Sequence, residues 1–213
     1  MKPARAERLF FLRLFFLRLS ILICSLLFLS SMATGQTPPP QQPAATPQPA
    51  TPQPATSQPA ANPADVSSID AIIAAVYDVI SGPAGKKRDW QRMRSLFIPG
   101  ARMIPTGPRR EGGIASSVVD VEGYITRSGN YLETNGFFEK ETARRTDQYG
   151  HIAHAFSTYE ARHKADDKTP FMRGINSFQL MNDGKRWWVV TIFWEAETPE
   201  NPIPEKHLKT EMK

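Results

Sequence analysis

The stretch Asn182 to Glu197, NDGKRWWVVTIFWEAE, decides the fold of this chain. It starts with an Asp-Gly turn, which gives the backbone the freedom that a hairpin needs, and continues as a β-branched and aromatic run typical of a strand. Residues alternate between two faces along a strand, so its aromatic residues separate into two pairs, Trp188 with Trp194 and Trp187 with Phe193. Because both faces are apolar, we expect this strand to be covered on both sides within a curved sheet.

Residues 1–35 have the pattern of a secretory signal peptide, in which basic residues precede an apolar run and small residues provide a cleavage site. Arg13 and Arg18 interrupt the run, and its uninterrupted part is shorter than the ~20 apolar residues that a membrane span needs. We therefore expect an exported protein, periplasmic or secreted. The alternative is an uncleaved signal anchor, which would be the chain's only membrane contact.

Cysteine content and charge exclude several classes of function. Cys24 is the only cysteine, and it lies inside the predicted signal segment. The mature protein then has no thiol, which excludes disulfides, cysteine-ligated zinc and a cysteine nucleophile. The net charge of +5 also comes largely from residues 1–35, since residues 36–213 hold 21 basic and 20 acidic residues. A nearly neutral chain lacks the electrostatic footprint of a nucleic-acid binder.

The rest of the chain divides by composition into a linker, one domain and a tail. Residues 36–64 include ten prolines and repeat an Ala-Thr-Pro-Gln-Pro unit, which predicts an extended, disordered spacer. Residues 65–198 form one domain of ordinary size. Residues 199–213 are broken by prolines and have little to bury, so we expect a flexible C-terminal tail.

Hydrophobic periodicity and turn signals give the order of elements in the domain. Three helices come early, with a short strand before the third, and four long strands joined by short turns follow. Helices gathered ahead of a strand meander predict an α+β fold, in which the three N-terminal helices pack in the concave face of a curved antiparallel sheet. The expected ranges are 69–80, 89–97 and 120–134 for the helices, and 101–104, 137–148, 151–163, 171–181 and 186–197 for the strands.

Three segments, AIIAAVYDVISG, DWQRMRSLFIPGARMI and GKRWWVVTIFW, in this order resemble the nuclear-transport-factor-2-like superfamily, which includes SnoaL-like and ketosteroid-isomerase-like proteins. The resemblance covers nearly all of residues 66–197 and suggests an exported bacterial member. It implies a cone-shaped fold with a deep apolar cavity, and often a homodimer through the outer face of the sheet. The superfamily hosts isomerases, dehydratases, hydrolases and members without shown activity, so the fold does not choose the function.

The resemblance also implies a carboxylate base on the first strand, and this sequence has none there. Ile104 and Pro105 occupy the position, and neither side chain accepts a proton. This departure counts against a ketosteroid-isomerase mechanism. Tyr77 lies near the place where such enzymes position a phenol that stabilises an oxyanion. Its alternative interpretation is a core tyrosine with its hydroxyl at the rim.

The histidines do not form a metal site in this interpretation. His151 and His154 are three apart, so they face opposite sides of a strand and cannot chelate together. His154 shares its face with Ile152 and Phe156, and we therefore expect it to point toward the interior as a candidate general base. The alternative is a core histidine with satisfied hydrogen bonds. No dinucleotide or phosphate motif is present, and we expect neither a metal nor a cofactor.

Further residues extend the predicted ligand-binding set. Asn176 is expected to be buried, where its amide must find partners. Arg102 either offers a cation to the cavity or pairs with a carboxylate at the surface. The tryptophans either wall the cavity or belong to the core or a dimer interface. The full predicted set is Tyr77, Arg102, Tyr124, His154, Asn176, Phe178, Trp188 and Trp194.

Three functions remain open from the sequence. The first is an exported domain that binds a small apolar or amphipathic molecule without converting it. The second is an isomerase, dehydratase or hydrolase that uses His154 as general base together with Tyr77 or Tyr124. The third is a dimeric protein-interaction module whose cavity is filled by side chains. The sequence leaves open whether the protein is an enzyme.

Overall fold

A computed structural model describes residues 58–209 of the chain, so the predicted signal peptide and most of the predicted linker lie outside the described residues. Within 58–209 no helix is long and apolar enough to cross a membrane. The elements are η1 (Pro63–Val66), α1 (Ile69–Ile80), α2 (Trp90–Leu96), β1 (Phe97–Pro108), β2 (Ile114–Ser116), α3 (Val121–Asn135), β3 (Phe138–Tyr149), β4 (Ile152–Arg162), β5 (Met172–Asn182), β6 (Trp187–Ala196) and η2 (Glu205–His207).

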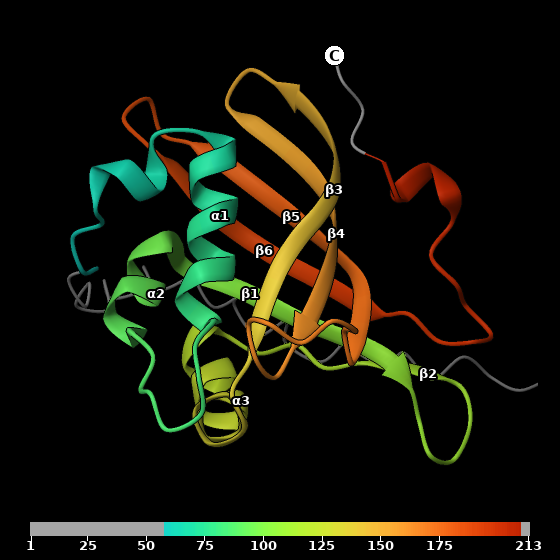
Figure 1. Cartoon of the computed structure of the whole chain (residues 1–213). Helices are drawn as coiled ribbons and strands as arrows, with labels where there is room; N and C mark the ends of the chain where they lie inside the picture. The colour runs from blue at the N-terminus through green and yellow to red at the C-terminus, as the bar shows by residue number, and fades with distance from the viewer. Residues whose placement is uncertain (1–57, 210–213) are drawn as a thin grey trace, which may run out of the picture. The chain divides into compact units, whose positions relative to one another are not determined.

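The strands form one six-stranded sheet in the order β2-β1-β6-β5-β4-β3. The predicted α+β fold is confirmed, with α1, α2 and α3 on one side of the curved sheet (Figure 1). One pair differs from the predicted antiparallel arrangement, because β1 runs parallel to β6. These two strands are separated in the chain by α3 and four further strands rather than joined by a hairpin, so no tight turn forces them to be antiparallel.

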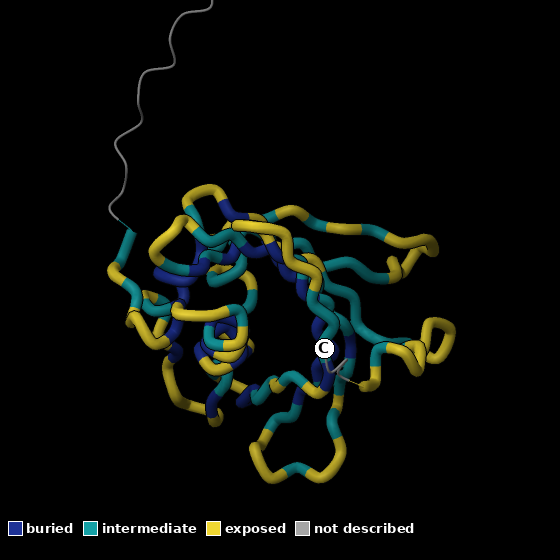
Figure 2. The backbone as a smooth tube through the Cα atoms, turned by 90° about the horizontal axis from the view of Figure 1, so that it is seen from above, coloured by how far each residue is buried: buried dark blue, intermediate teal, exposed yellow. Residues whose placement is uncertain are grey.

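The helices begin at side-chain caps and bury one stripe each. The Ser68 hydroxyl accepts the Ala71 N–H at 3.0 Å and so caps α1. Asp89 caps α2, accepting the Arg92 N–H at 2.8 Å. The buried positions of α1 face the sheet, and Figure 2 shows buried segments along the inner sides of the helices and strands.

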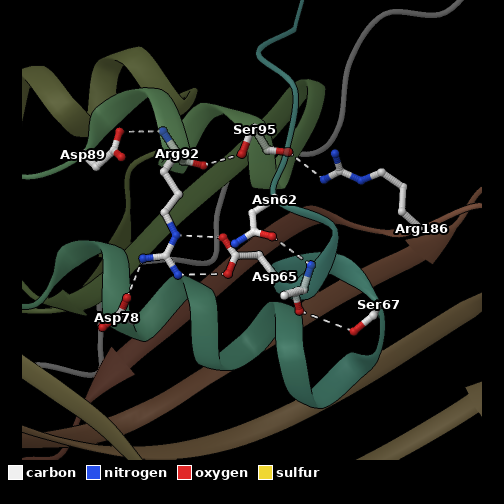
Figure 3. Close-up of polar contacts among 9 residues, drawn as sticks. Asn62, Asp65, Ser67, Asp78, Asp89, Arg92, Ser95 and Arg186 are labelled. Carbon is white, nitrogen blue, oxygen red and sulfur yellow. Dashed lines mark hydrogen bonds and ion pairs between the residues drawn. The ribbon is translucent and has the colours of Figure 1, made fainter.

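Arg92 ties the N-terminal part of the domain together (Figure 3). Its guanidinium binds both carboxylate oxygens of Asp65, at 2.7 and 3.0 Å, and also contacts Asp78 on α1. The Arg186 guanidinium, from the turn before β6, donates to the Ser95 carbonyl on α2 at 2.6 Å. A bidentate guanidinium–carboxylate pair restrains orientation as well as distance. These contacts fix α1 and α2 relative to each other, and α1 carries part of the site described below.

A β-bulge in β6 changes which tryptophans share a face. Thr191 pairs with Gln179 but Val189 pairs with Leu180, so Val190 is an extra residue in the strand. One extra residue reverses the alternation of side chains beyond it.

The structure therefore corrects the predicted pairing of the aromatic residues. Trp187 is buried on the helix side, and beyond the bulge Trp194 faces the same side and packs against Tyr124 of α3. Trp188 lies near the turn and Phe193 is 46% exposed on the outer face. The prediction that Trp188 and Trp194 share a face was wrong because strict alternation assumes a strand without a bulge.

The segment 198–209 packs on the outer face of the sheet, opposite to the helices (Figure 1). The Thr158 hydroxyl on β4 donates to the His207 carbonyl, and the rings of Phe156 and His207 lie 5.0 Å apart. Near its start, the Ile203 N–H donates to the Glu197 carboxylate at 2.9 Å. Most residues of this segment are exposed and none of the described residues 198–209 is buried, so its contact with the sheet is confined to a few side chains.

Candidate functional site

A cavity of about 300 Å³ lies between the helices and the concave face of the sheet. α1 and α3 form one wall, and the inward residues of β3 to β6 form the other. The wall is mainly aromatic and aliphatic, and among residues 58–209 Glu139 and Arg127 are the only charged residues that line it. The residues that most define the aromatic wall are Tyr77, Tyr124, Tyr131, Tyr159, Phe178 and Trp194.

Glu139, the second residue of β3, provides the acidic group of the cavity. The Asn176 amide on β5 donates to its carboxylate at 3.0 Å. Burial raises the pKa of Glu139 to about 7, and the hydrogen bond from Asn176 offsets part of this effect. Desolvation disfavours the charged form, so this carboxyl is poised to exchange a proton near neutral pH.

A chain of hydrogen bonds runs from Asn176 along the wall of the cavity. The same amide nitrogen donates to the Tyr77 hydroxyl at 3.1 Å, and this hydroxyl lies 2.7 Å from the Ser157 hydroxyl. Ser157 donates to the Glu141 carboxylate at 2.6 Å. Because a serine hydroxyl has one proton, Tyr77 must donate to Ser157 when Ser157 donates to Glu141. Tyr77 thus holds Asn176 in place and has no proton left for a ligand.

Two other phenols in the cavity wall have uncommitted protons. Neither the Tyr124 nor the Tyr159 hydroxyl has a hydrogen-bond partner among residues 58–209. Burial raises the pKa of both, and the charge of Glu139 raises each further. The field of Glu139 thus reaches both hydroxyls, which stay protonated and able to donate. Glu139, Tyr124 and Tyr159 together offer one proton acceptor and two donors in an apolar space.

Five of the predicted ligand-binding residues lie in the cavity wall. Three of them, Tyr77, Tyr124 and Phe178, contribute rings, and Asn176 contributes the amide that holds Glu139. Trp194 also lines the cavity, with its ring edge-on to Tyr124 at 6.2 Å. The structure therefore brings these residues together from α1, α3, β5 and β6.

His154 lies on the other side of the sheet, and its predicted inward orientation was wrong. Its ring Nε2 is 2.9 Å from the Ser177 hydroxyl, and its ring lies 5.9 Å from that of Phe156. The inward residues of β4 are small or lie beneath α1, such as Ala153 and Ala155, which are buried. The outward face of β4 is also apolar, because segment 198–209 covers part of it. The apolar neighbours Ile152 and Phe156 therefore did not show that His154 faces inward.

Arg102 and Trp188 also lie outside the cavity, contrary to prediction. Arg102 is exposed and donates to the Gly100 carbonyl at 2.9 Å. The Trp188 indole donates to the Asp183 carboxylate at 2.8 Å, and the Arg186 guanidinium lies 3.6 Å above its ring. These contacts hold the turn before β6, so the role of Trp188 is local.

The sequence interpretation missed Glu139, Tyr159 and Arg127. It assigned residues 137–148 to a strand without singling out Glu139, and it sought the acid on the first strand, where Ile104 and Pro105 stand. The cavity therefore contains an acid, supplied by β3 instead. Glu139 and Glu141 alternate with Phe138 and Lys140, which is a period-2 signal that two carboxylates share a face. Only the position of α1 shows that this face is the covered one.

Comparisons with known proteins give structural neighbours only. No protein-family model and no curated protein matches the sequence. A protein of unknown function with a cystatin-like fold from Nostoc punctiforme is similar in structure, with a TM-score of 0.46, 13% identity and coverage of 62% of this chain and 90% of that one.

Two NTF2-like proteins of unknown function are also similar. The protein from Shewanella baltica has a TM-score of 0.40 and 18% identity, covering 60% of this chain and 89% of its own. The protein from Silicibacter pomeroyi has a TM-score of 0.41 and 15% identity, covering 62% and 94%. All three TM-scores lie below 0.5, so the function has to be argued from the cavity itself.

Proposed function

We propose that this domain binds a small, largely apolar molecule carrying a carbonyl or hydroxyl group in the cavity between the helices and the sheet. The observation that carries the proposal is the convergence of Glu139, Tyr124 and Tyr159 in an otherwise apolar space of about 300 Å³. Ligand sites are typically apolar cavities with a few polar groups that fix orientation. A volume at the lower end of the usual range, roughly 300–1,000 Å³, favours a small ligand.

The wall suggests how such a ligand would be held. Its apolar body would pack on Phe178 and Trp194, while a carbonyl oxygen would accept hydrogen bonds from the two free phenols. A ligand hydroxyl would instead donate to Glu139. Each neutral hydrogen bond contributes about 0.5–1.5 kcal/mol, so the phenols would orient the ligand while apolar burial supplies most of the affinity.

A second candidate function is proton transfer next to a carbonyl group, favoured by the pKa of about 7 at Glu139. In this reaction Glu139 takes a proton from the carbon beside the carbonyl, and the electron pair of that C–H bond moves to give an enolate. Tyr124 and Tyr159 donate hydrogen bonds to the enolate oxygen, and Glu139 returns the proton to carbon. This assignment replaces the earlier alternative with His154, which lies on the opposite face.

The proposal also includes export of the protein and its association into a homodimer. The signal-like pattern of residues 1–35 supports export to the periplasm or the medium. A homodimer through the outer face is supported by the exposed Phe193 on that face. Native mass spectrometry of the exported protein would report the dimer, the cleavage of the signal and any ligand that co-purifies.

Binding is tested with N-phenyl-1-naphthylamine, a neutral apolar probe whose fluorescence rises in apolar sites. Met172 is half-buried in the cavity wall, so Met172→Trp should fill the cavity and weaken probe binding by about tenfold or more. The matched control is Phe193→Trp on the outer face, which should leave the affinity within about twofold. Equal affinity for wild type and Met172→Trp would place the probe elsewhere and reject the cavity as the site.

Proton transfer is tested with a simple ketone, cyclohexanone, by following the exchange of its α-hydrogens for deuterium in D₂O by NMR. The reaction would be supported if the wild-type protein exchanges these hydrogens faster than buffer alone and Glu139→Gln abolishes the excess rate. Exchange that Glu139→Gln leaves unchanged would remove Glu139 as the base, and simple binding would remain.

A further inference from the structure

Arg127 stands at the open side of the cavity as its only cationic residue. It lies on α3, in the stripe that also carries Tyr124 and Tyr131, because residues three and four apart share a helix face. Arg127 is exposed and Tyr131 is 45% exposed, whereas Tyr124 packs inward against Trp194. The stripe thus runs from the interior to the surface, and Arg127 marks the mouth.

The Arg127 guanidinium is held in place without being neutralised. Its Nη1 donates to the Ser117 hydroxyl at 2.6 Å, and no carboxylate among residues 58–209 pairs with it. Several other arginines of the domain do have carboxylate partners, namely Arg92, Arg94, Arg144, Arg162 and Arg173. A guanidinium has five N–H donors, and most of those on Arg127 remain available.

The two charged groups of the cavity impose a direction on any ligand. Glu139 lies in the interior, where an anionic ligand group would meet both desolvation and, above neutral pH, a like charge. Arg127 lies at the mouth, where an anion stays partly hydrated and gains charge-assisted hydrogen bonds. An acidic ligand would therefore enter with its apolar body first and keep its anionic group at the surface.

We infer that the ligand of this cavity is an apolar acid, whose carboxylate or comparable anionic group pairs with Arg127 while its apolar body fills the interior. The inference rests on the proposed function and adds the ligand class and orientation. Arg127 is thereby a specificity-determining residue that separates acids from their neutral counterparts. Ser117 is a positioning residue, since its hydroxyl holds the guanidinium over the mouth.

A matched pair of probes tests this inference. N-phenyl-1-naphthylamine is neutral, and 1-anilinonaphthalene-8-sulfonate has the same ring system with one anionic sulfonate. Wild-type protein should bind the sulfonate more tightly. Arg127→Gln should weaken sulfonate binding by about 5–30-fold and leave the neutral probe within about twofold, as expected for loss of a partly exposed charge-assisted contact. The control Arg102→Gln removes an exposed arginine outside the cavity and should change neither affinity.

Two further measurements place the effect at the mouth. Met172→Trp should weaken both probes, which shows that they share the cavity. Added NaCl should weaken sulfonate binding to wild type and have a smaller effect on Arg127→Gln, since salt screens the pairing of exposed charges.

Each outcome separates the inference from the proposed function. If both probes bind wild type equally, or if Arg127→Gln and Arg102→Gln have the same effect on the sulfonate, the inference is overturned and apolar binding in the cavity stands. If neither probe binds wild type, both are overturned. Because Arg127 is exposed, its replacement is not expected to unfold the protein, and circular dichroism of the variant checks this.

Discussion

The two faces of the sheet carry cavities of nearly equal volume with different walls. The inner cavity, about 300 Å³, is lined by α1, α3 and inward strand residues, and hydrogen bonds through Tyr77 of α1 connect Asn176 on β5 with Ser157 on β4. The outer cavity, about 290 Å³, lies between β4, β5 and β6 and the irregular segment 198–209. Similar volume does not imply similar chemistry, because the inner face holds a buried acid on rigid elements and the outer face does not.

The glutamates Glu139 and Glu141 show how burial and partners tune the same side chain within one strand. Both lie on the inner face of β3, and burial raises the pKa of each. Glu141 also accepts from Ser157 and lies near the Arg144 guanidinium, and both contacts lower its pKa again. Glu139 has only the hydrogen bond from Asn176, so it is the carboxyl poised near neutrality.

The largest effect should come from Gly174→Ala on the inner face of β5. An added Cβ would lie 2.4 Å from the Glu195 carbonyl oxygen and 2.5 Å from the Tyr159 hydroxyl, which is too close for either. We expect a loss of about 2–4 kcal/mol in the free energy of unfolding, measured by urea denaturation. Gly107→Ala is the control, since nothing lies within 4 Å of its added Cβ. Equal stability of the two variants would show that the inner face is loosely packed.

A smaller effect, with a defined pH dependence, should come from Glu139→Gln. The pKa of Glu139 in the folded protein, about 7, lies above its ordinary value of 4.5, so the folded state favours the protonated acid. Its favourable contribution is complete below about pH 4 and is lost as the pH rises to about 7. The uncharged glutamine should therefore raise the free energy of unfolding by about 1–3 kcal/mol at about pH 8.

The same variant should give little gain at about pH 4, where Glu139 is already protonated. Urea denaturation across this pH range measures both values. Glu200→Gln, an exposed position, is the control and should show no such dependence. A gain that does not change with pH would contradict the buried, titrating carboxyl.

Truncation after Thr198 should affect the outer face alone. It removes the contacts of His207 with Thr158 and Phe156 and exposes apolar side chains of the sheet. We expect a loss of about 1–2 kcal/mol in stability, and affinity for N-phenyl-1-naphthylamine within about twofold of wild type. A large loss of probe affinity would show that the two faces are coupled and that the outer segment supports the inner cavity.

The smallest effect should come from His154→Gln. Glutamine can still hydrogen-bond the Ser177 hydroxyl, so the free energy of unfolding should change by less than about 0.5 kcal/mol. Probe affinity and any ketone exchange should stay unchanged, because His154 lies on the outer face. Loss of either activity on this substitution would restore the histidine as a functional group. Asn176→Leu is the corresponding substitution on the inner face. It should alter both probe affinity and ketone exchange, because Glu139 loses the hydrogen bond that Asn176 donates.

The sequence by itself determined the α+β class and the order of the three helices and the five longer strands. These follow from local rules, namely hydrophobic periodicity and turn residues, and the aromatic run of β6 is the clearest example. It also identified five of the cavity residues, because α1, α3 and β5 keep regular periods through Tyr77, Tyr124 and Phe178.

Only the tertiary structure decided which face of each strand is inside and which acid enters the cavity. Period-2 alternation separates two faces but does not say which one the helices cover, so His154 was placed inward and Glu139 was overlooked. The bulge at Val190 then reversed the alternation between Trp188 and Trp194. The pKa of Glu139 is raised by burial, and this burial depends on packing between α1 and β3, which are far apart in sequence. The sequence supplied the functional groups, and long-range packing determined which of them meet in the cavity.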